Sequence, residues 1–128
     1  MEDDRITLAH RNGGRFMREL IEDVFATALS ASELDVQADA VPIDLGDGEV
    51  MITTDGFTVQ PLEFPGGNIG SLAIHGTTND LAVAGARPMY LTLNAFIEEG
   101  FEVARLERIV RSLADAAVEA GVRISAGD

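Results

Sequence analysis

Four aspartates stand where their carboxylates could bind a metal ion. Asp39 is at the entry to a predicted strand, and Asp55 follows another predicted strand directly before a glycine. Asp80 lies inside a predicted helix, and Asp128 follows a glycine at the end of the last predicted strand. Strand ends line ligand crevices in layered α/β folds, and Mg²⁺ prefers oxygen ligands. Together the four predict a site for a phosphate-bound cation.

Two of these aspartates also have a purely structural explanation. The Asp55-Gly56 pair is equally typical of a turn in which the carboxylate accepts a backbone hydrogen bond. Asp80 has no basic residue three or four positions away, so it either faces solvent or is compensated from outside its helix, and its apolar flanks favour the second. His75, in the same helix, is either a site residue or a hydrogen-bonded interior histidine.

A glycine pair precedes the first predicted helix in the segment Asn12-Gly13-Gly14. Glycine lets the backbone approach a ligand closely, and the free N–H groups at a helix start attract phosphate. Taken alone, the pair is explained more simply as a tight entry turn.

The residue types that are missing exclude several kinds of chemistry. The chain has no cysteine, which excludes a disulfide, a thiolate zinc site and a cysteine nucleophile. All nine basic residues are arginine, so neither a P-loop nor a Schiff-base lysine is present. The two histidines, His10 and His75, each lack a second histidine at helical spacing. Carboxylates, glycine-rich backbone and arginine remain as the chemical groups.

The charge balance is strongly acidic, with 22 acidic and nine basic residues and a net charge of −13. A phosphate backbone would be repelled, so we do not expect nucleic-acid binding. The acids are scattered along the chain, which favours a generally acidic, solubilising surface. No apolar stretch approaches the roughly 20 residues needed to cross a bilayer, and the start of the chain lacks a basic region, so we expect a cytoplasmic protein.

The periodicity of apolar residues predicts three helices and four strands. Helical spacing covers residues 16–29, 69–84 and 102–120, with Asn68 as an N-cap and Gly85 and Gly121 as helix ends. Strands are predicted over 40–45, 50–54, 89–97 and 122–126, the first two joined by a turn at 46–48. We therefore expect one domain over residues 1–128, of α/β or α+β class, with helices packed on a mixed β-sheet.

Several motifs, spread over essentially the whole chain, occur in the same order as in one known family. The chain resembles the HypE family of hydrogenase maturation factors, within the superfamily of aminoimidazole ribonucleotide synthetase. The motifs that carry the resemblance are HRNGGR at 10–15, TTD at 53–55, FPGGNIG at 64–70, HGTTNDLA at 75–82 and the terminal Gly127-Asp128.

The resemblance implies an ATP-dependent activity with Mg²⁺. Family members dehydrate a carboxamide carried on their own C-terminal cysteine, and the thiocyanate supplies cyanide ligands for the iron of nickel-iron hydrogenase. In the family, a second domain and the cysteine tail follow the position of Asp128, so we expect this chain by itself to be inactive. The resemblance also implies a homodimer paired into a barrel, and as partners the carbamoyltransferase and the iron-carrying maturation complex.

The resemblance assigns roles to individual residues as well. It implies metal ligands at Asp39, Asp55, Asp80 and Asp128, and nucleotide contacts at Asn12, Gly13, Gly14 and Asn79. Family members commonly have glycine at the position of Arg11 and a second acid at that of Ala38, which leaves the metal number open. Two alternatives remain: a non-catalytic dimerisation or partner-docking module, and a piece of another ATP-dependent synthetase or kinase of the superfamily.

Overall fold

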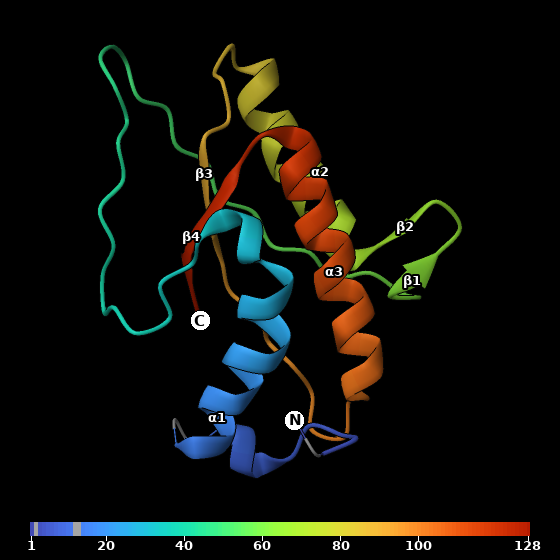
Figure 1. The fold of residues 1–128 in the computed structure, drawn as a ribbon. Helices are drawn as coiled ribbons and strands as arrows, with labels where there is room; N and C mark the ends of the chain where they lie inside the picture. Colours follow the sequence, from blue (N-terminus) through green and yellow to red (C-terminus); the bar gives the residue numbers. More distant parts are fainter. Residues whose placement is uncertain (2, 12–13) are drawn as a thin grey trace.

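The amino-terminal part of the structure is helical. The structure is a computed structural model that describes residue 1, residues 3–11 and residues 14–128. A 3₁₀ turn, η1 (Leu8–Arg11), precedes α1 (Arg15–Leu20), which continues as the wider π-helical η2 (Ile21–Ala26) before the short η3 (Ser30–Ser32) (Figure 1). Leu20, Val24 and Leu29 turn inward and are buried. The helix predicted over 16–29 is confirmed.

Helix α2 (Ile69–Val83) begins with the predicted cap. The side-chain oxygen of Asn68 accepts hydrogen bonds from the backbone N–H groups of Gly70 and Ser71, at 2.9 and 3.1 Å. The Ser71 hydroxyl in turn accepts from the Asn68 backbone N–H at 3.0 Å. These bonds satisfy helix-start donors that would otherwise lack partners. The helix ends at Ala84, and Gly85 follows it with a φ of +86°.

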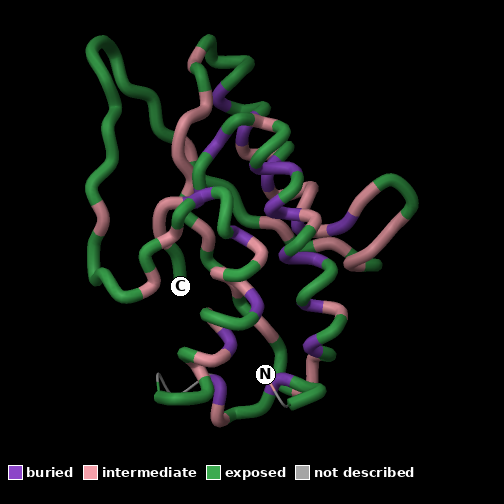
Figure 2. The backbone as a smooth tube through the Cα atoms, viewed as in Figure 1, coloured by how far each residue is buried: buried purple, intermediate pink, exposed green. Residues whose placement is uncertain are grey.

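Helix α3 (Val103–Ala120) packs along α2 and carries much of the core. Its buried face contributes to two clusters, one with Leu29 and Ile74 and one with Ile6 and Leu20. Gly121 ends the helix with a φ of +71°, as predicted. Figure 2 shows the buried positions of the helices facing the middle of the molecule.

The strands form two separate two-stranded sheets. β1 (Glu63–Phe64) pairs antiparallel with β2 (Gly67–Asn68), and β3 (Tyr90–Leu93) pairs parallel with β4 (Arg123–Gly127). The strands predicted over 89–97 and 122–126 are therefore confirmed, although β3 is shorter than expected. The expectation of a single mixed sheet is wrong for the described residues.

Residues 38–60, called the arm below, leave the body of the molecule and return to it (Figure 1). Gly46 and Gly48 turn the chain with φ angles of +66° and +107°, but the arm contains no β-strand. The strands predicted over 40–45 and 50–54 are therefore wrong for this chain alone. The physical reason is that a ribbon of two strands is marginal in water without a third strand or a packed face.

Among the residues that the structure describes, no helix is both long enough and apolar enough to span a membrane.

Candidate functional site

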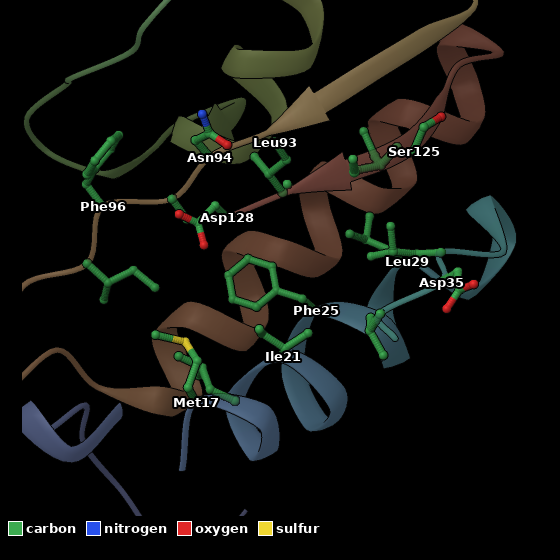
Figure 3. Close-up of a pocket in the computed structure, with 18 of the residues that line it drawn as sticks. Met17, Ile21, Phe25, Leu29, Asp35, Leu93, Asn94, Phe96, Ser125 and Asp128 are labelled. Carbon is green, nitrogen blue, oxygen red and sulfur yellow. The ribbon is translucent and has the colours of Figure 1, made fainter. Parts of the chain in front are cut away.

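A cavity of about 870 Å³ lies between the amino-terminal helix, the start of the arm and the carboxyl ends of β3 and β4. Met17, Ile21 and Phe25 supply an apolar wall, which Figure 3 shows opposite the ends of the two strands. The carboxyl ends of parallel strands are where ligands bind in open α/β sheets. The cavity is therefore the strongest candidate for a ligand site.

Two of the four predicted metal ligands, Asp39 and Asp128, line this cavity. The backbone of Asp128 is held at the end of β3, since its N–H donates to the carbonyl of Leu93 at 2.9 Å and its carbonyl accepts from Ala95 at 2.8 Å. A side chain at Gly127 would collide with the Leu93 carbonyl, so glycine is required for this close approach. The aspartate that follows β4 is thereby fixed at the cavity.

The other two predicted metal ligands, Asp55 and Asp80, do not line this cavity and are exposed. Asp80 thus faces solvent in this chain, and the expectation that a group outside its helix compensates its charge stays a prediction. No three histidine or acidic side chains among the described residues are grouped closely enough to hold a metal ion. Within one chain, the structure brings together only Asp39 and Asp128 of the four.

Asn79 lies at a second, shallower hollow together with His75, Pro88 and Ala120. His75 is exposed, so its interpretation as an interior histidine is wrong. Gly14 is the N-cap of α1 with an extended backbone, and its carbonyl accepts from the Arg18 N–H at 3.1 Å. Asn12 and Gly13 lie outside the described residues.

Five of the residues that line the main cavity are acidic. Its carboxylates belong to Asp35, Asp39, Glu98, Glu99 and Asp128, and within the described part of the chain neither arginine nor lysine lines it. A polyphosphate placed there would be repelled unless cations bridged it to the protein. The carboxylate oxygens are the ligands that a hard divalent cation such as Mg²⁺ prefers.

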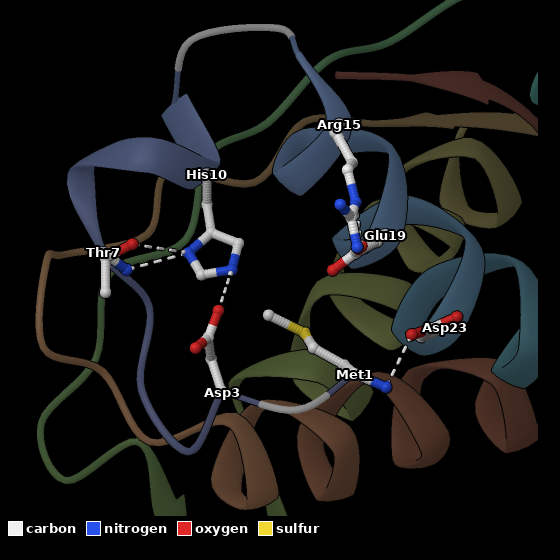
Figure 4. A network of polar contacts seen from close by, with 7 residues as sticks. All are labelled: Met1, Asp3, Thr7, His10, Arg15, Glu19 and Asp23. Carbon is white, nitrogen blue, oxygen red and sulfur yellow. Dashed lines mark hydrogen bonds and ion pairs between the residues drawn. The ribbon is translucent and has the colours of Figure 1, made fainter.

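His10 forms part of the cavity lining and was not assigned a role from the sequence. Its side chain is 1% exposed. Its Nδ1 accepts from the Thr7 backbone N–H at 2.9 Å, and its Nε2 lies 3.4 Å from the carboxylate of Asp3 (Figure 4). Nearby, the α-amino group of Met1 lies 2.7 Å from the carboxylate of Asp23, whose hydrogen bond raises the pKa of that amino group. In the sequence, only the position of His10 shortly before the glycine pair could have suggested that it lies at the cavity.

Comparison with known proteins gives the family. Residues 37–128 match the sequence model of the family described as AIR synthase related protein, N-terminal domain. The chain belongs to this family. The matched range contains the arm and everything that follows it, including all four aspartates and Asn79, whereas Gly14 precedes it.

The curated relatives place the chain with the HypE proteins of the AIR synthase related family. It is 49% identical over its whole length to the carbamoyl dehydratase HypE of Azotobacter vinelandii, of which it covers 38%. It is 42% identical to the Escherichia coli K12 protein of the same name over 98% of this chain and 39% of the relative. This AIR synthase related domain is therefore HypE-like, and it spans about two fifths of its relatives' length.

Solved HypE structures share the fold. A crystal structure of hydrogenase maturation protein HypE in complex with ATP superposes with a TM-score of 0.91 and 45% identity, over 96% of this chain and 36% of that one. HypE in a crystal structure of a HypE–HypF complex matches with a TM-score of 0.59 and 42% identity, over 90% of this chain and 35% of that one. The HypE-like domain described here thus has the architecture of the corresponding part of those proteins.

Proposed function

We propose that this chain is the nucleotide-binding and dimerisation domain of a HypE-like hydrogenase maturation factor acting in the cytoplasm. In full length such a protein would use ATP to dehydrate a carboxamide on a C-terminal cysteine to a thiocyanate, the source of cyanide for nickel-iron hydrogenase. The observation that supports this best is the TM-score of 0.91 to a HypE structure in complex with ATP.

The donor groups at the cavity suit a nucleotide bound through Mg²⁺. We assign the metal to Asp39 and Asp128, which line the cavity, and to Asp55 and Asp80, which lie outside it in one chain. We assign the nucleotide to Asn79, at the second hollow, and to the segment Asn12-Gly13-Gly14. Bound Mg²⁺ would neutralise the phosphates and stabilise charge that develops during phosphoryl transfer. The residues of this chain would hold and orient the cation, and the apolar wall around Phe25 would exclude water from one side of the cavity.

The exposed arm supports a homodimer. It presents a group of large apolar side chains to solvent, namely Ile43, Leu45, Val50, Met51 and Ile52, of which Ile52 is 94% exposed. Exposed apolar patches of this kind mark interaction surfaces. A second copy of the arm would bury these side chains and supply the missing strand partners. It would also bring additional carboxylates near those of the first copy.

The same similarity supports the proposed partners. Since a HypE protein has been crystallised in a complex with HypF, we propose that the full-length form of this protein docks on the carbamoyltransferase and then on the iron-carrying maturation complex.

Calorimetric titration of the folded chain with ATP tests the proposed function. We expect ATP to bind only in the presence of Mg²⁺. Asp55→Asn and Asp80→Asn should each weaken this binding by at least about tenfold, because each substitution removes a charged oxygen ligand. The matched control is Asp115→Asn, which changes an exposed aspartate on α3. Absence of heat from a folded wild-type chain, with dimerisation retained, would instead favour a non-catalytic dimerisation module.

A further inference from the structure

Phe57 of the arm packs onto Gly76 of α2. We propose that this contact is a positioning element that holds Asp55 level with Asn79 and Asp80. The inference rests on the proposed function, because it concerns how a metal and nucleotide site is aligned. In this proposal Phe57 and Gly76 do not touch the ligand. They act by positioning Asp55 relative to Asn79 and Asp80.

The contact is tight enough to require glycine in the helix. A Cβ atom at Gly76 would lie 2.6 Å from Cζ and 2.7 Å from Cε1 of the Phe57 ring. Glycine is otherwise unfavourable in a helix interior, so the space it leaves for the ring gives it a structural purpose. Phe57 is half-buried, whereas its neighbours Gly56 and Thr58 are exposed.

A second contact fixes the direction in which the arm runs past α2. The carbonyl of Leu62 accepts a hydrogen bond from the N–H of Ile69, at the start of the helix, at 2.9 Å. Phe57 meets the helix further along, at Gly76. Residues 57–62 therefore run antiparallel to α2 (Figure 1). Residues that precede Phe57 must pass the later part of the helix.

This direction brings three polar residues to the same level. At about 3.3 Å per residue, Asp55 lies roughly 7 Å beyond Phe57 along the extended arm. At 1.5 Å per residue, Asn79 and Asp80 lie about 4.5–6 Å beyond Gly76, and they share its face of the helix. The distance from Phe57 to Asp55 along the arm is thus nearly equal to the distance from Gly76 to Asn79 and Asp80 along the helix. The carboxylates of Asp55 and Asp80 are therefore aligned.

The burial along the arm shows which side of it faces the body. Thr53, Phe57 and Val59 are half-buried, whereas residues 54–56 and Thr58 are exposed. In an extended chain, residues two apart point to the same side, so Asp55 is in phase with the side that faces the body. Its carboxylate remains exposed, as is needed if it is to reach a ligand. Because no strand ladder holds the arm, the ring of Phe57 sets its register.

Cross-linking tests the register without any ligand. The chain has no cysteine, so introduced pairs react specifically. With a short bis-maleimide, Asp55→Cys/Asp80→Cys is expected to cross-link about tenfold faster than Asp55→Cys/Ala73→Cys, because proximity raises the effective concentration of the second thiol. Ala73 is the matched control: it shares the helix face of Gly76 but lies about one turn in the opposite direction.

Each cross-linking rate is divided by the rate at which the single cysteine on α2 reacts with a mono-maleimide. This correction is needed because Ala73 is half-buried and Asp80 is exposed, so the two thiols differ in access to the reagent. Equal corrected rates, or a faster Ala73 pair, would overturn the proposed register.

A double-mutant cycle tests the consequence for ligand binding. Gly76→Ala is expected to weaken Mg²⁺-dependent ATP binding about tenfold, the usual cost of losing a group that orients ligands. In a Phe57→Ala background the same change should have no further effect, because the ring it displaces is gone. Gly56→Ala is the control, since a Cβ there meets no atom within 4 Å, and its affinity should match that of wild type.

The outcomes separate this inference from the proposed function. A folded Gly76→Ala variant that binds ATP as tightly as wild type, or additive effects in the cycle, would overturn the positioning role while leaving the proposed function intact. A wild-type chain that binds no ATP would remove the proposed function, and the positioning role with it, whereas the cross-linking would still report the register of the arm.

Discussion

Glu63 connects the β1–β2 hairpin to α3 through two arginines. The Nε atoms of Arg105 and Arg108 donate to its carboxylate at 3.1 and 3.0 Å, and a second nitrogen of Arg108 donates at 3.2 Å. The hydrogen bond from Arg108 is the main cause that lowers the pKa of Glu63; Arg105 acts in the same direction, and desolvation opposes both. This carboxylate therefore stabilises the fold only while it is ionised.

We expect Glu63→Gln to destabilise the protein in a pH-dependent way. Because the folded-state pKa lies below the ordinary value of 4.5, the contribution is fully present above that value and is lost as the pH falls through the lowered pKa. Thermal melts between about pH 3 and pH 7 should show the variant below wild type at neutral pH, with the difference becoming smaller as the pH falls below 4.5. Glu119→Gln, at an exposed position of α3, is the control. A difference that stays constant with pH would contradict the assignment.

At the scale of elements, α2 uses two glycines for two different contacts. Gly70 is buried, and a Cβ there would collide with the backbone carbonyl of Ile109 on α3. Gly76 meets the ring of Phe57, a side chain on the arm. A backbone carbonyl inside a packed helix cannot move aside, whereas a side chain on the arm can. The first glycine therefore supports the fold, and the second supports the position of the arm.

Gly70→Ala is expected to cost about 1–3 kcal/mol of unfolding free energy, because it overpacks the contact between α2 and α3. Gly76→Ala should leave stability close to that of wild type, since the gain in helix propensity offsets the displaced ring. Urea unfolding monitored by circular dichroism measures both. Equal losses in the two variants would show that the arm is part of the cooperative fold.

At the scale of the whole molecule, the arm is the part that the body does not cover. Figure 2 shows it largely exposed, away from the packed helices. A long exposed segment with apolar side chains is costly in water unless it is paired. A homodimer through the arm would also contain two copies of the cavity that Asp39 and Asp128 line.

Ile52→Asp is expected to convert the proposed dimer into a monomer. A charge on a side chain that is 94% exposed in one chain costs little there, but in a closed interface it would be buried without a partner. Sedimentation velocity at about 50 µM, where an interface of moderate affinity is populated, measures the change. Val118→Asp, on an α3 side chain that is 62% exposed, should leave the association unchanged. A wild-type monomer under these conditions would contradict the dimer.

The sequence by itself determined the helices, their ends and the kinds of chemical group available. Apolar periodicity located α2 and α3, and Asn68, Gly85 and Gly121 marked their ends, because caps and periodicity depend on residues only a few positions apart. The residue types also restricted the chemistry to carboxylates, glycine-rich backbone and arginine.

The tertiary structure decided which distant residues meet. It placed Asp39 with Asp128, held Glu63 with two arginines of α3, and set Phe57 on Gly76. It also left 40–45 and 50–54 without strand partners, although their local pattern favours strands. Strand pairing and contacts across the fold depend on what lies beside a segment in space, and neither spacing nor propensity along the chain records that.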